Sequence, residues 1–242
     1  MTFGGETTAL FAPYYDLYPL ETSANLVDWK PLALLQRTNA TLDPPHFLDP
    51  DAQFVLDELG RLNAADPRFA GRLDLDKMGM FGHSLGGATA AQLCLRDPRC
   101  KAGAAMDGSY FETNLLTRTL SVPDLFFRAG DGPAPDPANG LPDGRPDDRL
   151  AVNHHLVTNA YWVKLVSTIH LSFGDADLIF NAASMAAYWN TPTSGQFLPP
   201  ARVTQVVRAY LLAFFNKYLR GEDDHLLDGP SPAYPEVMQF LK

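Results

Sequence analysis

The stretch MFGHSLGGATAA, residues 80–91, constrains the fold of this 242-residue chain more than any other. It places Ser84 between Gly82 and Gly86, at the point where an apolar run gives way to small residues. The apolar run predicts a short strand within residues 73–83, and the small residues predict a helix that begins directly after the serine. A strand, a tight turn and a helix in this order would hold Ser84 at the end of a strand.

The pattern Gly-x-Ser-x-Gly is typical of a nucleophilic serine on a strained turn between a strand and a helix. We expect glycine at both Gly82 and Gly86 because such a turn brings backbone segments so close that a side chain at either place would clash. The N–H of Leu85, at the start of the helix, would point to where an oxyanion develops. The sequence therefore predicts Ser84 as a nucleophile and Leu85 as an oxyanion-hole donor.

A nucleophilic serine needs a histidine base, which in folds with this turn follows the serine and an acid along the chain. The chain has six histidines: His46, His83, His154, His155, His170 and His225. The first two precede or adjoin the serine, and the next two fall in a predicted helix. His225 lies in a charged segment beyond the last predicted helix, where a solvated histidine is expected. Only His170 falls at the end of a predicted strand, so we predict it as the base.

Two carboxylates compete to orient that base. Asp107 ends the predicted strand CKAGAAMD, and Asp131 ends the next one, PDLFFRAGD. Both would lie at the same edge of a parallel sheet as Ser84. The order of residues leaves the choice between them open.

The remaining pattern alternates strands with helices. A helix is expected to begin at Asp49-Pro50 and run to about residue 63, and an amphipathic helix over residues 203–218 is expected to stop at Gly221. Residues 1–48 are predicted to be irregular apart from a short helix within 26–36, and residues 131–148 form a loop rich in proline and glycine. The alternation predicts a single α/β domain, with a mostly parallel sheet covered by helices on both faces.

Composition narrows the classes of partner. The chain has 28 acidic and 19 basic side chains and a formal charge of −9, which disfavours nucleic acid and anionic membranes. No apolar run is long enough to span a membrane, and the first residues lack the pattern of a signal peptide, so a soluble protein is expected. No phosphate-binding loop, dinucleotide fingerprint or zinc pattern is present, and we expect no cofactor and no metal. Cys94 and Cys100 are expected to pack as small apolar groups rather than to pair.

Three segments resemble the bacterial and fungal platelet-activating factor acetylhydrolase-like esterases, which have the α/β-hydrolase fold. They are RLDLDKMGMFGHSLGGATAAQ, AGAAMDGSYF and STIHLSFGDADLIF, within a similarity that runs from about Asp49 to Pro235. In that family the acid follows the first strand after the nucleophile, in a segment like MDG. The resemblance therefore implies Asp107, rather than Asp131, as the third member of a triad with Ser84 and His170.

The resemblance further implies hydrolysis of short-chain esters or phospholipid sn-2 esters through an acyl-enzyme, without calcium. Related lipases and polyester hydrolases use a similar turn, and a non-catalytic or weakly active binding protein is the alternative from another class. The sequence departs from the family at its beginning, because Met1 falls beyond the strands and the glycine-containing loop that supply the other oxyanion amide. We therefore expect a shortened fold with an open edge at the strand before Ser84, which a second copy or a completing chain would cover.

Overall fold

The computed structural model describes residues 2–3, 6–10, 17–23, 30–36, 49–108, 121–130, 160–175 and 197–241. Contacts between Cα atoms separate the chain into two compact units, residues 1–79 and 80–242. The predicted loop 131–148 lies outside the described residues. Whether the two units make one domain, as the sequence predicts, stays a prediction.

The first unit contains an antiparallel sheet and a helix. The sheet has the order β1-β2-β3-β4, and its strands are β1 (Thr2–Phe3), β2 (Glu6–Leu10), β3 (Leu17–Ser23) and β4 (Lys30–Gln36). The irregular segment expected over residues 1–48 is wrong for its described parts, because these form the four strands of this sheet. The helix expected within 26–36 is also wrong, because residues 30–36 pair with β3 as a strand instead. Tertiary pairing decides a short apolar run such as LALL, which periodicity alone cannot assign.

Helix α1 (Asp49–Ala65) follows that sheet in the chain and begins where the Asp49-Pro50 pair predicts. Its buried side chains recur at helical spacing: Val55, Leu56, Leu59 and Leu62. Phe69 and Leu73, in the segment leading to the next strand, are also buried.

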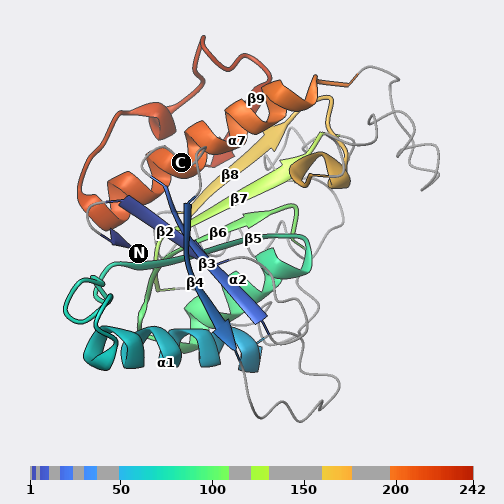
Figure 1. Ribbon diagram of the computed structural model, residues 1–242. Coiled ribbons are helices and arrows are strands. Elements are labelled where there is room, and N and C mark those ends of the chain that lie inside the picture. Colours follow the sequence, from blue (N-terminus) through green and yellow to red (C-terminus); the bar gives the residue numbers. More distant parts are fainter. Residues whose placement is uncertain are drawn as a thin grey trace. The chain divides into compact units, whose positions relative to one another are not determined.

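The second unit is built on a five-stranded sheet with the order β5-β6-β7-β8-β9, whose first strand begins two residues before the boundary between the units (Figure 1). Its strands are β5 (Met78–His83), β6 (Cys100–Met106), β7 (Asp124–Ala129), β8 (Ala160–Leu165) and β9 (Val237–Leu241). Strand β6 pairs in parallel with β7, and β7 pairs in parallel with β8. Strand β9 runs antiparallel to its neighbour β8. The predicted mostly parallel sheet is confirmed.

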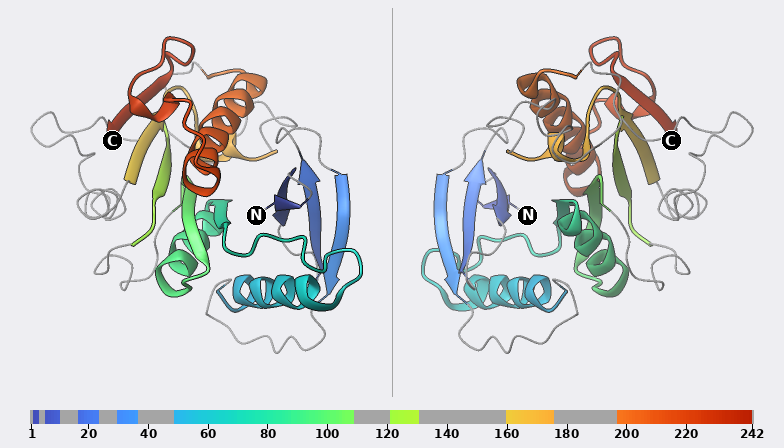
Figure 2. Two further views of the ribbon diagram at one scale, coloured as in Figure 1. Left: turned by 90° about the vertical axis from the view of Figure 1, so that its left-hand side faces the viewer. Right: turned by 90° about the vertical axis from the view of Figure 1, so that its right-hand side faces the viewer.

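Helices cover the two faces of this sheet, as alternate residues of β6 reveal. Ala102 and Ala104 belong to the apolar cluster that contains α7 (Pro200–Phe215), which lies beside the sheet in both views of Figure 2. A Cβ atom on Gly87, in α2 (Leu85–Arg96), would instead meet Ala105 at 3.2 Å. Successive residues of a strand point to opposite faces. Helices α2 and α7 therefore pack on opposite sides.

The last predicted helix ends as the sequence indicates. After α7, a π-helical turn η2 (Asn216–Arg220) continues the chain to Gly221, whose φ of 75° is the left-handed conformation that favours glycine at a helix end. None of the described helices is long and apolar enough to cross a membrane.

The expectation that Cys94 and Cys100 stay unpaired is wrong. They form a disulfide between the last turns of α2 and the first residue of β6, with Cα atoms 4.9 Å apart. The chain reverses between them at Asp97, whose carbonyl accepts the N–H of Cys100 at 3.1 Å. Six residues of separation would keep the two thiols far apart on one helix, but this reversal brings them together. The bridge links helix α2 to strand β6 of the sheet.

Candidate active site

Ser84 stands in the turn between β5 and α2, in a strained backbone conformation. Its φ is 55° and its ψ is −121°, which is rare for a residue with a side chain. Its N–H donates to the carbonyl of Met106 in β6 at 2.9 Å, and its own carbonyl accepts the N–H of Gly87 at 3.0 Å. The serine is thus held from both sides by backbone hydrogen bonds, with Leu85 as the first helical residue after it.

The tightness of this turn depends on Gly82 rather than on both predicted glycines. A Cβ atom at Gly82 would meet the backbone of Gly86 at 2.4 Å, which no side chain tolerates. At Gly86 a Cβ atom would meet no described atom within 4 Å, so the expected clash there is wrong. The close approach at the helix instead involves Gly87, where a Cβ atom would lie 2.9 Å from the carbonyl oxygen of Gly82.

Asp107 directly follows β6 and has the same kind of backbone conformation as Ser84. Its φ is 48°, and its N–H donates to the carbonyl of Phe127 in β7 at 2.9 Å. The next residue must be small, because a Cβ atom at Gly108 would lie 3.1 to 3.2 Å from backbone atoms of Ser84, Gly87 and Ala88. The acid-bearing turn is therefore packed directly against the serine-bearing turn.

His170 reaches the same place by a different route. Strand β8 ends at Leu165 rather than at His170 as predicted, and His170 begins a short 3₁₀ helix, η1 (His170–Phe173). The intervening segment is fixed by Thr168, whose hydroxyl donates to the carbonyl of Leu165 at 2.6 Å and accepts the N–H of Gly130 at 3.1 Å. The extra residues carry the imidazole from the strand end to Ser84.

These three side chains form one line of hydrogen bonds. The Oγ of Ser84 lies 2.8 Å from Nε2 of His170, and Nδ1 of His170 lies 2.7 Å from Oδ2 of Asp107. The Asp107 carboxylate is buried, with 7% of its side chain exposed, whereas 43% of the His170 side chain is exposed. This arrangement lets the imidazole accept a proton from the serine while its other nitrogen donates to the carboxylate.

The surroundings of Asp107 keep it ionised. Burial raises the pKa of Asp107, but the His170 hydrogen bond, the charge of Arg128 and the N–H of Ala129 together lower it below its usual value. Nη1 of Arg128 lies 3.4 Å from Oδ1, and the N–H of Ala129 donates to the same oxygen at 3.1 Å. An ionised Asp107 would stabilise an imidazolium formed on His170 by proton transfer.

Two residues near this line were not predicted to take part. Arg128 is buried in β7, where an arginine in the apolar run DLFFRA was the available signal, since a buried charge needs a partner. His83 was set aside as a base, but its Nε2 lies 2.8 Å from the carbonyl oxygen of His170. The sequence shows that His83 precedes Ser84, but it does not show that η1 lies against His83.

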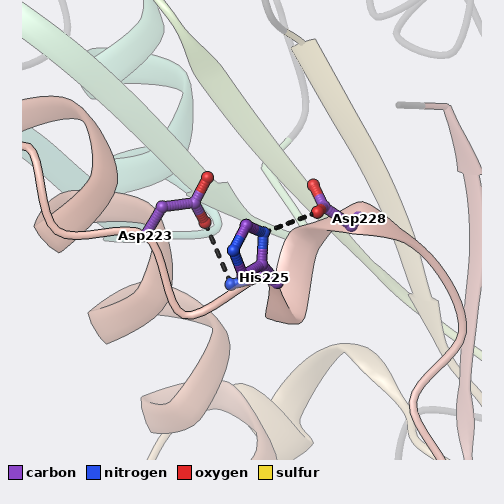
Figure 3. Close-up of side chains that lie close together, drawn as sticks. All are labelled: Asp223, His225 and Asp228. Carbon is purple, nitrogen blue, oxygen red and sulfur yellow. Dashed lines mark hydrogen bonds and ion pairs between the residues drawn. The ribbon is translucent and has the colours of Figure 1, made fainter.

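Other candidates of the sequence lie elsewhere. The rival acid Asp131 and three histidines, His46, His154 and His155, are outside the described residues. His225 is exposed, as expected for a solvated histidine, and forms a cluster with Asp223 and Asp228 (Figure 3). Lys217 already supplies a cation there, with Nζ 2.7 Å from Asp223. We assign no metal ligands to this cluster.

Comparison with known proteins points to esterases. A probable 1-alkyl-2-acetylglycerophosphocholine esterase of the fungus Arthroderma benhamiae is 28% identical over 172 residues, which are 67% of this chain and 43% of the fungal protein. The solved structure of the ferulic acid esterase from Streptomyces cinnamoneus superposes with a TM-score of 0.61 and 28% identity, over 86% of this chain and 59% of that one. The chain is a distant homologue of α/β-hydrolase esterases.

The sequence resemblance to acetylhydrolase-like esterases and the predicted α/β-hydrolase fold are thereby confirmed. No family model matches the chain. The chain spans less than half the length of the fungal relative and about three fifths of the Streptomyces structure.

Proposed function

We propose that this protein is a serine hydrolase of carboxylic esters that works through an acyl-enzyme, with Ser84, His170 and Asp107 as its catalytic residues. The observation that carries the proposal is the unbroken line of hydrogen bonds from Ser84 through His170 to Asp107, at 2.8 and 2.7 Å. The strained backbone of Ser84 and the distant homology of the chain to esterases support the same conclusion. Residues held in such strained backbone conformations cluster at active sites.

In the first half of the reaction, Oγ of Ser84 attacks the ester carbonyl while its proton passes to Nε2 of His170. The tetrahedral intermediate collapses, the ester C–O bond breaks, and the same proton passes from Nε2 to the departing alcohol. In the second half, water gives its proton to Nε2 and attacks the acyl carbon, and the proton then returns to Oγ as the acid leaves. Asp107 holds the ring by accepting the hydrogen bond that Nδ1–H of His170 donates, and it stays ionised throughout.

The developing oxyanion would be stabilised by the N–H of Leu85. Leu85 is the first residue of α2, where backbone N–H groups have no acceptor within the helix. Acyl transfer of this type uses two such donors, and the loss of one costs about 10²- to 10³-fold in turnover. The expected absence or replacement of the family's other donor, and a chain that completes the edge at β5, stay predictions. Within the described residues, β5 is the end strand of its sheet.

For the substrate, we propose short-chain acyl esters, including the sn-2 acetyl esters of phospholipids named for the fungal relative. The Streptomyces relative is named for esters of an aromatic acid, ferulic acid, so an aromatic acyl group is the alternative within the same chemistry. Both need the same nucleophile, and they differ in the acyl group and in the alcohol that leaves.

The test compares wild type with Ser84→Ala on p-nitrophenyl esters of increasing chain length and on methyl ferulate. We expect hydrolysis by wild type and a loss of at least about 10⁴-fold in the variant. Stoichiometric labelling of Ser84 by a fluorophosphonate provides a second readout. Unlabelled, inactive wild type that is folded by circular dichroism would favour a binding protein instead.

A further inference from the structure

The imidazole of His83 occupies a position that no catalytic step above uses. It belongs to the last residue of β5, directly before the nucleophile, and it is half-buried. Its ring centroid lies 4.6 Å from that of His170, and the two planes are tilted by 40°. His83 therefore adjoins Ser84 in the chain and packs against the ring of His170 in space.

The polar contact of His83 is directed at the backbone of the base. Its Nε2 lies 2.8 Å from the carbonyl oxygen of His170. A carbonyl can only accept, so Nε2 carries the proton and donates it. His83 therefore bridges the serine-bearing turn and the segment that carries His170, and the other described hydrogen bond between them is the catalytic one, from Ser84 to His170.

Thr168 fixes the residues that precede His170, but His83 is the group that holds the carbonyl of His170 itself. Its side chain is 43% exposed, and it begins a 3₁₀ helix of only four residues. Asp107 restrains its ring but not the position of its backbone. A hydrogen bond to its carbonyl, from a strand of the sheet, sets how far the imidazole stands from Oγ of Ser84.

The charge state of His83 fits this role. Burial and the neighbouring His170 lower the pKa of His83, against smaller opposing effects of its hydrogen bond and of Asp107. A neutral ring at this place tolerates the imidazolium that forms on His170, whereas a cation 4.6 Å away would repel it. The described groups that face the ring are His170, Asp107, Phe173 and the backbone of Gly174.

We propose that His83 is a positioning residue, which holds His170 at its working distance from Ser84 through the Nε2–H donated to the His170 carbonyl. This inference rests on the proposed function of Ser84 and His170, and it adds a fourth residue to their reaction. His83 touches no substrate atom in this account and acts only through the base.

Two substitutions separate the hydrogen bond from the ring. His83→Phe keeps an aromatic ring against His170 and Phe173 but removes the donor, whereas His83→Gln places an amide N–H near the position of Nε2. We expect kcat to fall about 10- to 100-fold in H83F with little change in KM, as for other misplaced catalytic groups. H83Q should retain most of the wild-type kcat. Equal losses in both variants, or no loss in H83F, would overturn the proposal.

The pH profile supplies a readout that packing would not change. As the pH falls, the slope of log(kcat/KM) against pH should exceed one in wild type, because His83 becomes charged beside His170. In H83Q that second proton is absent, so the slope of log(kcat/KM) should stay at one down to the lowest pH tested. A profile for H83Q that matches wild type on the acid side would contradict this effect of the His83 charge, whereas the Nε2–H donor, present in both charge states, is tested by H83F.

A proton NMR measurement works even if no ester is hydrolysed. The Nδ1–H of His170 in its hydrogen bond to Asp107 should give a low-field signal in wild type and in H83Q, and it should exchange faster in H83F. Inactive wild type would refute the proposed function alone, and the signal would still test His83. Unaltered exchange in folded H83F would refute the positioning.

Discussion

The turns that carry Ser84 and Asp107 are built alike, whereas the segment that carries His170 is built differently. Ser84 and Asp107 each directly follow a strand, with φ of 55° and 48°. The N–H of Ser84 donates to the carbonyl of Met106, and the N–H of Asp107 donates to the carbonyl of Phe127, both at 2.9 Å. His170 instead lies beyond β8 on a short helix, with its side chain 43% exposed.

This contrast separates two ways of placing a catalytic group. The sheet itself fixes Ser84 and Asp107, so a change in either turn should disturb folding as well as chemistry. His170 is placed by side chains, namely Thr168 behind it, His83 beside it and Asp107 at its ring. Changes around His170 should therefore affect rate more than stability, and changes near the two turns should affect both.

The largest expected effect comes from the charge at the second turn. Asp107→Asn should lower kcat by about 10⁴-fold on a p-nitrophenyl ester, because an amide no longer fixes the imidazole tautomer or stabilises the imidazolium. The matched control is Asp131→Asn, at the other acid that the sequence left open. Urea unfolding of both variants separates lost chemistry from lost structure. If activity were lost only in D131N, Asp131 and not Asp107 would be the acid of the triad.

A second prediction tests the backbone of the serine turn by comparing an alanine substitution at each of its two glycines, Gly82 and Gly86. Gly82→Ala should destabilise the protein by about 4 kcal/mol or more, because its Cβ would lie 2.4 Å from backbone that cannot move aside. Gly86→Ala should be neutral, or stabilising by up to about 1 kcal/mol, because alanine favours a helix and no described atom lies within 4 Å of the added Cβ. Urea denaturation of both gives the free energies of unfolding. Similar losses in the two variants would contradict the asymmetry of the turn.

The sequence predicts the two turns better than it predicts the histidine segment. Glycine at Gly82 and the strand–helix order around Ser84 are local signals, and both turns follow from where apolar runs stop. The proximity of Ser84, His170 and Asp107 in space was inferred from chain order and from resemblance. The contacts of His83 and Arg128 depend on how separate strands meet, which no local pattern records.

Other expectations failed for the same physical reason. Residues 30–36 read as part of a helix but pair as a strand, because cross-strand hydrogen bonds override weak local preference. The Cys94–Cys100 bridge depends on a chain reversal at Asp97. In each case the deciding contact lies across a turn or a sheet rather than along a run of residues.

The smallest expected effect concerns Arg128, which supports the Asp107 turn from β7. Arg128→Met should lower the free energy of unfolding at pH 7 by about 2 kcal/mol, below the usual cost of breaking a buried ion pair. Asp107 would keep two other partners, the Ala129 N–H and His170. Arg128→Lys keeps the charge and should lose less.

The pH dependence of this loss distinguishes charge from packing. The pKa of Asp107 lies below its unfolded value, so the stability from its ionised form is present above the unfolded pKa and disappears as pH falls through the folded pKa. Removal of Arg128 raises the pKa of Asp107, and the variant should lose this contribution at higher pH than wild type. The difference in unfolding free energy should thus shrink as the pH falls from neutral through the folded pKa of Asp107 in both proteins. A difference that stays constant with pH would mean that Arg128 stabilises the Asp107 turn by packing and not through its charge.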